Sequence, residues 1–171
     1  TVLFITVGLL FFRSTKDAIN SSKEKELITL AQETSNKIER YMFERYGDIQ
    51  VMASSPLLKS DAVDKNLKVD YLNSVRKAYN AYDYILIADT FGNVELYSGE
   101  LNNDRRYKEV VSGVLSGKTV VSDFIYFEDI NSYGVYYAAP ILDNQSNIKG
   151  AVIERMNFNA ILDIVENVKL G

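Results

Sequence analysis

Apolar residues dominate the first twelve positions of the chain, from Thr1 to Phe12, and they stop at Arg13. Twelve helical residues span about 18 Å, whereas the hydrocarbon core of a bilayer is about 30 Å thick. We interpret residues 1–13 as the outer end of a transmembrane helix. A signal-peptide core and a buried helix are the alternatives, but residues 12–18 contain no good signal-peptide cleavage site.

A helical period of apolar residues follows over residues 14–56. Glu and Lys fill the positions between the apolar ones, which predicts a long amphipathic helix. A stripe this narrow over so many turns favours a stalk helix that packs on a second copy as well as on its own domain. A helix that simply lies on one sheet is the alternative. Proline disfavours helix in the residue before it, so Pro56 ends the pattern. The apolar or partly apolar positions are Leu27, Leu30, Ala31, Thr34, Ile38, Tyr41, Met42, Ile49 and Met52.

Residues 57–171 form the remaining unit, which begins with a loop and a second predicted helix over Val69–Asn80. After this helix the period becomes that of strands. The pattern predicts a hairpin, a helix that ends near Leu115, three further strands and a closing helix. Runs of antiparallel strands with helices set to one side predict an α+β domain around a five-stranded antiparallel sheet. The predicted strands and closing helix are 82–89, 94–97, 120–127, 134–141, 148–156 and, for the helix, 159–170.

Composition narrows the possible functions. The chain has 171 residues, enough for one domain with a real core, and a net charge of −4 with both signs mixed. It has no basic stripe, so we expect no nucleic-acid partner. It has neither His nor Cys, which removes the commonest general base, thiolate chemistry and most transition-metal sites. No Gly-rich phosphate loop occurs either. We therefore expect no metal, no cofactor and no enzymatic activity.

Five segments carry a likeness to a known family; they are Ile85–Val94, Asp104–Tyr107, Val121–Tyr126, Tyr136–Ile141 and Gly150–Ile153. In their order behind a membrane-anchored helix they resemble the Cache family, whose PAS-like domains are the extracytoplasmic sensors of bacterial chemoreceptors and sensor histidine kinases. The likeness covers about residues 15–170. The end of the chain resembles the exit from the membrane-distal module of a double-Cache sensor, and a single-Cache domain is the alternative.

The resemblance also implies ligand-binding residues. Arg105 and Tyr107 match the helix start that binds a ligand carboxylate in amino-acid-binding members of the family. Tyr126 and Glu128 match a Tyr-x-Asp pair that binds the ligand amine. Arg155 stands where the last strand of the family has an Asp. Because a guanidinium offers a bidentate fork to a carboxylate, two arginines in one pocket would favour an anion or a dicarboxylate over a zwitterion.

Simpler explanations exist for these residues. Arg105 and Arg155 could be surface residues that pair with nearby carboxylates such as Glu109 and Glu154. The alternation of side chains along a strand decides which of Glu154 and Arg155 points inward. Tyrosines on strands are by default core residues whose hydroxyls reach water.

The sequence thus predicts a ligand-sensing module of a membrane receptor that faces the periplasm or the extracellular side. We expect it to bind a small polar ligand that bears a carboxylate, to sit in the membrane through its N-terminal helix and to form a homodimer through the long helix. The alternative is a structural or dimerising module that binds nothing, with sensing in a following module. Inward-pointing Arg105 and Tyr126 would favour sensing, whereas an apolar plug would favour the structural role.

Overall fold

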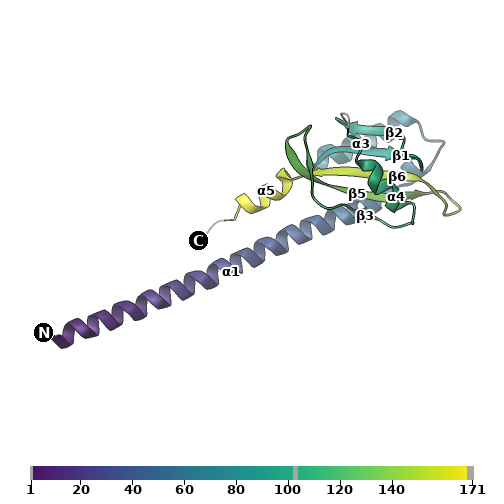
Figure 1. Cartoon of the computed structure of the whole chain (residues 1–171). Helices are drawn as coiled ribbons and strands as arrows, with labels where there is room; N and C mark the ends of the chain where they lie inside the picture. The colour runs from purple at the N-terminus through teal and green to yellow at the C-terminus, as the bar shows by residue number, and fades with distance from the viewer. Residues whose placement is uncertain (1, 102–103, 169–171) are drawn as a thin grey trace.

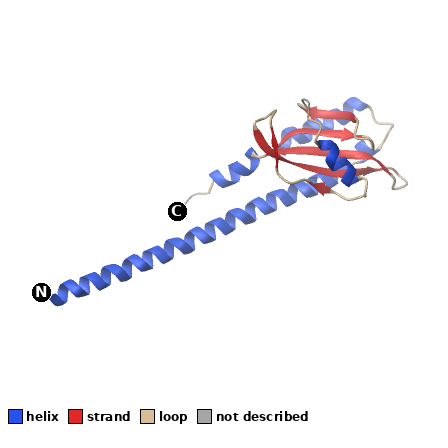
Figure 2. Ribbon diagram, viewed as in Figure 1, coloured by secondary structure: helices blue, strands red, loops and turns tan. Residues whose placement is uncertain are grey.

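The computed structural model describes residues 2–101 and 104–168, with the side chains of residues 15–16, 19–101 and 104–168. Figures 1 and 2 show a long helix that leads into a twisted sheet with helices packed around it. The helices are α1 (Val2–Ser54), α2 (Pro56–Lys59), α3 (Lys65–Tyr79), α4 (Tyr107–Val114) and α5 (Asn159–Glu166). The strands are β1 (Tyr82–Ala88), β2 (Val94–Gly99), β3 (Val120–Val121), β4 (Ile125–Phe127), β5 (Ser132–Leu142) and β6 (Ile148–Asn157).

The strands form one antiparallel sheet in the order β2-β1-β6-β5-β3, with β4 also paired to β5. The three central strands β1, β6 and β5 are buried on both faces, because helices cover each side. Alternate residues therefore enter two separate cores. We call the face covered by α1, α2, α3 and α5 the stalk face, and the opposite face the α4 face.

The core on the stalk face forms where the C-terminal part of α1 crosses the sheet. Ile49, Met52 and Ala53 of α1 pack with Leu58 of α2 and Leu72 of α3. Alternate strand residues complete this core from below; they are Tyr82, Ile85, Ile87, Val135, Tyr137, Ala139, Ile141, Val152 and Met156. This packing holds α1 against the domain from about Ile38 onward.

The N-terminal part of α1 projects beyond the sheet, and α5 lies on the same side (Figure 1). The two helices contact each other along an apolar groove. The boundary that we predict between residues 13 and 14 falls inside α1, and the side chains of the apolar segment 1–13 lie outside the described residues. Among the residues that the structure describes, no helix is both long and apolar enough to cross a membrane.

The α+β class and the long helix are confirmed, but the sheet has six strands rather than five. The strand predicted over residues 120–127 is divided into β3 and β4. Ser122 causes the division, because its hydroxyl oxygen accepts the hydrogen bond of the Tyr136 N–H at 2.9 Å. A side chain thereby replaces the backbone carbonyl in the ladder, and the regular pairing stops there.

Helix boundaries also differ from the predicted ones. The second helix begins at Lys65, four residues before the predicted Val69, because Asp64 caps it by accepting the Asn66 N–H at 2.7 Å. The long helix ends at Ser54, and Pro56 begins the short α2, as expected of proline in a first helical turn.

Candidate functional site

Arg155 lies at the centre of the α4 face. It pairs in register with Tyr84 of β1 on one side and Tyr136 of β5 on the other. Its side chain is only 1% exposed. Burial of a guanidinium in a sheet core demands compensating charge.

A β-bulge provides part of that compensation. Tyr82 pairs with Met156 and Tyr84 with Arg155, so Asp83 is an extra residue on β1. Such an extra residue breaks the alternation of side chains and can redirect one of them. Here the Asp83 carboxylate lies 2.9 Å from Nε of Arg155.

Two further carboxylates complete the surroundings of Arg155. Asp104, in the segment before α4, accepts from Nη1 at 3.1 Å, and its side chain is 1% exposed. Asp129, in the turn between β4 and β5, accepts from Nη1 and Nη2 at 3.1 Å. The guanidinium also lies over the rings of Tyr84 and Phe127, at 4.8 and 4.6 Å from their centroids. Arg155 is therefore fully engaged by its own protein.

Asp104 joins this ion cluster to two buried tyrosines. Tyr84 and Tyr136 both donate their hydroxyls to its Oδ2, the former at 3.0 Å. Its other oxygen accepts the Arg106 N–H at 3.0 Å. The two hydroxyls also lie 3.3 Å from each other. Every hydrogen bond that Asp104 accepts has a charged acceptor, so these bonds are stronger than neutral ones of the same number.

The environment shifts the titration of the cluster. Burial alone would lower the pKa of Arg155, but Asp83, Tyr84 and Asp129 outweigh it, so the pKa is raised and the guanidinium stays charged. Burial raises the pKa of Asp83, and the charge of Arg155 opposes that rise. Burial also raises the pKa of both Tyr84 and Tyr136, which stay neutral donors.

An open hollow lies above this cluster, lined by Asp104, Arg105, Arg106, Glu128 and Asp129. Arg105 and Glu128 are exposed there. Neither side chain makes a hydrogen bond or ion pair with any residue that the structure describes. Arg106 is more engaged, since its Nη1 donates to the Tyr126 carbonyl at 2.6 Å and its guanidinium lies 4.2 Å from the Phe127 ring centroid. The hollow thus presents one guanidinium and one carboxylate that have no hydrogen-bond or ion-pair partner among residues 15–16, 19–101 and 104–168.

The remaining predicted site residues lie elsewhere. Tyr107 is buried in the core beneath α4, and its hydroxyl donates to the Gly92 carbonyl at 3.4 Å. Tyr126 lies beside the hollow, where its ring packs on Tyr133 and its hydroxyl donates to Asn131. The structure therefore brings Arg105 and Glu128 together in one hollow, above a buried Arg155.

Sequence reasoning did not identify the partners of Arg155. These are Asp83, Asp104, Asp129, Tyr84 and Phe127, with Tyr136 beside Arg155 in the register of the strands. The register Tyr84–Arg155–Tyr136 was the signal that could have found the tyrosines, because all three alternate onto one face. The bulge that turns Asp83 leaves no comparable trace in the sequence.

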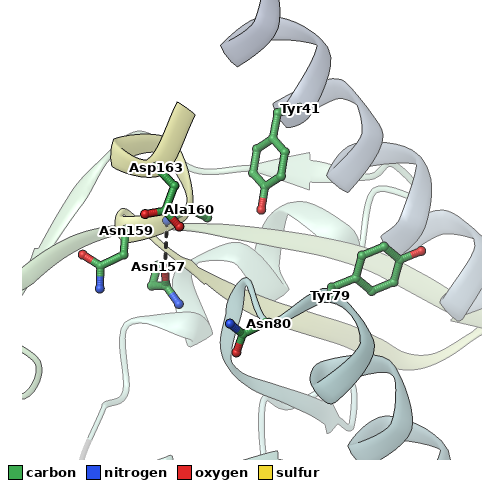
Figure 3. Close-up of a pocket in the computed structure, with 7 residues that line it drawn as sticks. All are labelled: Tyr41, Tyr79, Asn80, Asn157, Asn159, Ala160 and Asp163. Carbon is green, nitrogen blue, oxygen red and sulfur yellow. Dashed lines mark hydrogen bonds between the residues drawn. The ribbon is translucent and has the colours of Figure 1, made fainter. Parts of the chain in front are cut away.

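A second polar hollow lies on the other side of the sheet, between α1, α3 and the start of α5 (Figure 3). Asn157 accepts the Ala160 N–H at 3.3 Å there and fixes the first turn of α5. Its lining residues are Tyr41, Tyr79, Asn80, Asn157, Asn159, Ala160 and Asp163.

Solved structures of bacterial sensor domains have a similar fold. The sensor domain of the V. cholerae histidine kinase DctB superposes with a TM-score of 0.68 at 17% identity, over 84% of this chain and 59% of that one. The chain has the fold of Cache-type sensor domains. The sensory domain of the Campylobacter jejuni chemoreceptor Tlp3 with isoleucine bound gives 0.64 at 16% identity, over 82% of this chain and 61% of that one.

A third Cache-type neighbour is the ligand-binding domain of the Pseudomonas aeruginosa chemoreceptor PctC in complex with GABA. It gives a TM-score of 0.61 at 13% identity, over 80% of this chain and 61% of that one. The chain thus spans about three fifths of the length of each of these sensor domains. No protein-family model matches the sequence, and no curated protein matches it. The neighbours are sensory rather than catalytic domains.

Proposed function

We propose that this chain is a ligand-sensing module of a bacterial transmembrane receptor, with the hollow at Arg105 as its ligand site. The observation that carries the proposal is the pair of exposed charges at Arg105 and Glu128, which have no partner among the described residues and lie beside the Arg155 ion cluster in a Cache-type fold. Neighbours of this fold hold isoleucine and GABA, small molecules that carry a carboxylate. A receptor of this class would face the periplasm or the extracellular side and reach the membrane through α1.

The charges of the hollow define the ligand class. Arg105 offers a bidentate fork to a carboxylate. Arg155 is not available to a ligand, because Asp83, Asp104 and Asp129 already bind it. The guanidinium of Arg105 and the carboxylate of Glu128 together suit a ligand with both a carboxylate and an ammonium group. The pair suits a dicarboxylate less well, because the second cation of the hollow, Arg106, already binds the Tyr126 carbonyl and lies 3.7 Å from Asp104.

A thermal-shift screen with the 171-residue chain tests this proposal. The panel holds amino acids, mono- and dicarboxylates, amines and sugars. A ligand at a hundred times its dissociation constant adds about 2.7 kcal/mol to the free energy of unfolding. We expect a hit that bears a carboxylate, lost in Arg105→Ala and kept in Arg40→Ala, which removes an exposed arginine on α1. A hit that both variants keep would move the site away from Arg105.

A structural module that binds nothing is the second candidate, and a specific observation favours it. Arg155 fills the centre of the α4 face and satisfies its charge internally, so the interior of the domain holds a polar plug. A well-folded chain that shows no shift with any ligand in the panel would favour this structural role.

Homodimerisation through the stalk is part of the proposal. The groove between α1 and α5 is apolar, and Leu27 and Val165 are about half exposed. Sedimentation equilibrium with Leu27→Glu tests it: we expect the wild-type chain to dimerise and the variant to be monomeric. If the wild-type chain and Leu27→Glu have equal masses in solution, the groove between α1 and α5 is not a dimer contact.

A further inference from the structure

Glu154 lies buried on the stalk face, next in sequence to Arg155 but on the opposite side of the sheet. It is 0% exposed and sits between Ile85 of β1 and Tyr137 of β5 in the register of the strands. Within the part of the chain that the structure describes, neither of its carboxyl oxygens has a hydrogen-bond partner. A buried carboxylate in that position carries a large desolvation penalty.

The only cation that interacts with Glu154 within the described residues is Arg45 of α1, and its charge is already engaged. Arg45 binds the carboxylate of Asp48 at 2.9 Å through both Nε and Nη2. Its guanidinium lies between the rings of Tyr41 and Tyr79, at 4.7 and 4.5 Å from their centroids. Tyr79 in turn donates its hydroxyl to Asp48 at 3.1 Å. Arg45 is thus held by its own helix and by α3.

The other groups that face Glu154 are phenols and one more carboxylate. Tyr82 of β1 and Tyr137 of β5 have buried hydroxyls that, like Glu154, lack a hydrogen-bond partner among the described residues. Burial raises the pKa of Glu154 well above its ordinary value. The negative charge of Asp48 adds to the rise, whereas the charge of Arg45 and the nearby Tyr82 hydroxyl oppose it. The titratable groups around Glu154 are, from α1, Tyr41, Arg45 and Asp48; from α3, Tyr79; from β1, Tyr82; and from β5, Tyr137.

We propose that Glu154 is a proton-binding site that couples the packing of α1 on the sheet to pH. The neutral acid fits the buried layer between the sheet and α1. The ionised form requires water or a free cation, and both require α1 to move away from β6 or Arg45 to leave Asp48. Deprotonation therefore loosens the contact through which the stalk helix is attached to the domain.

The sign of the effect follows from linkage. The unfolded chain loses the proton of Glu154 near the ordinary carboxyl pKa, whereas the folded chain keeps it to higher pH. Between these two values the folded state binds one more proton, so stability falls as pH rises. The unfolding equilibrium constant should grow tenfold for each pH unit in this window and level off above it.

Urea unfolding of the 171-residue chain between pH 5 and pH 9 tests the proposal. We divide the unfolding equilibrium constant of the wild-type chain by that of Glu154→Gln at each pH. This ratio should rise tenfold for each pH unit until it reaches a plateau. The control Glu95→Gln removes an exposed glutamate from β2, and its ratio to wild type should not change with pH. A constant ratio for Glu154→Gln would overturn the proposal.

Two measurements connect the proton to α1 and keep the test valid if the Gln variant folds poorly. Hydrogen exchange of the amides of residues 41–53, corrected for intrinsic rates, should lose protection with rising pH in wild type. The same loss in Glu154→Gln would assign it to another group. In the wild-type chain at neutral pH, infrared spectra should contain the band of a protonated carboxyl; its absence would contradict the proposal without any variant.

Discussion

Replacement of Arg155 by Met removes the charge at the centre of the α4 face and keeps most of the side-chain volume. Three carboxylates then lose their common cation: Asp104 at 3.1 Å, Asp83 at 2.9 Å and Asp129 at 3.1 Å. Their exposures decide the cost. The Asp104 side chain is 1% exposed and cannot recover water, whereas Asp83 and Asp129 are 17% and 23% exposed and partly can.

The expected loss is dominated by Asp104. Removal of one partner from a buried ion pair costs about 3–5 kcal/mol, because the other charge stays buried without its counter-ion. The two rim carboxylates behave more like surface pairs, each worth about 0–1 kcal/mol. We expect Arg155→Met to lower the free energy of unfolding by about 3–5 kcal/mol in total, a large share of what a domain of this size possesses.

Urea titration at pH 7 measures this loss, with Arg106→Met as the matched control. Arg106 lies 3.7 Å from the same Asp104, but its side chain is 38% exposed, so we expect a loss of about 1 kcal/mol or less. Burial raises the pKa of Asp83 and the charge of Arg155 opposes that rise, so the variant should protonate Asp83 at higher pH than wild type does. The difference in free energy of unfolding between Arg155→Met and wild type should therefore narrow toward pH 4. Equal losses in the two variants would refute the assignment of Arg155 as the central charge.

Other changes probe the cores and turns. Leu72→Ala should cost about 2–5 kcal/mol in urea unfolding because Leu72 is 0% exposed, while Leu67→Ala on the exposed side of the same helix should cost little. Gly134→Ala should lower the free energy of unfolding by about 1–3 kcal/mol, since the added Cβ would lie 2.8 Å from the Met156 carbonyl oxygen. Gly47→Ala should raise it by about 0.5–1 kcal/mol, because Gly47 is helical and its Cβ would meet open space. The pKa of Asp89 is lowered by hydrogen bonds from Asn93, so its contribution is present above the ordinary carboxyl pKa and is lost as pH falls through the lowered value. Asp89→Ala should therefore lower Tm at pH 7 and have less effect near pH 2; an equal effect at both would contradict this.

The turn residues and apolar patterns of the sequence predicted elements that the structure contains. The hairpin turn forms as its residues require, with Asp89 accepting the backbone N–H groups of Phe91 and Asn93 at 2.8 Å. Helical periodicity located the long helix, because one of its faces must be buried. The central strands are buried on both faces, so runs of apolar and aromatic residues located them instead. The split of the third strand depends on one hydroxyl, that of Ser122, and no periodic signal reports it.

The candidate site was less accessible to sequence reasoning. The sequence posed Glu154 and Arg155 as alternatives for one inward position, yet both are buried, because helices cover both faces of the sheet. Whether Arg155 meets a ligand or its own carboxylates depends on the bulge at Asp83 and on the path of the segment before α4. Both are tertiary features, so resemblance could nominate Arg105 and Glu128 but could not show which charges stay free.

Because α1 is long, a small change in its angle at the sheet produces a large displacement at its far end. The helix has 53 residues, and the sheet holds it from about Ile38 onward. The remaining 36 residues extend about 54 Å at 1.5 Å per residue. Each degree of tilt at the sheet therefore displaces the far end of the helix by about 1 Å, so a side-chain rearrangement too small to alter the fold suffices to move that end by the width of an atom.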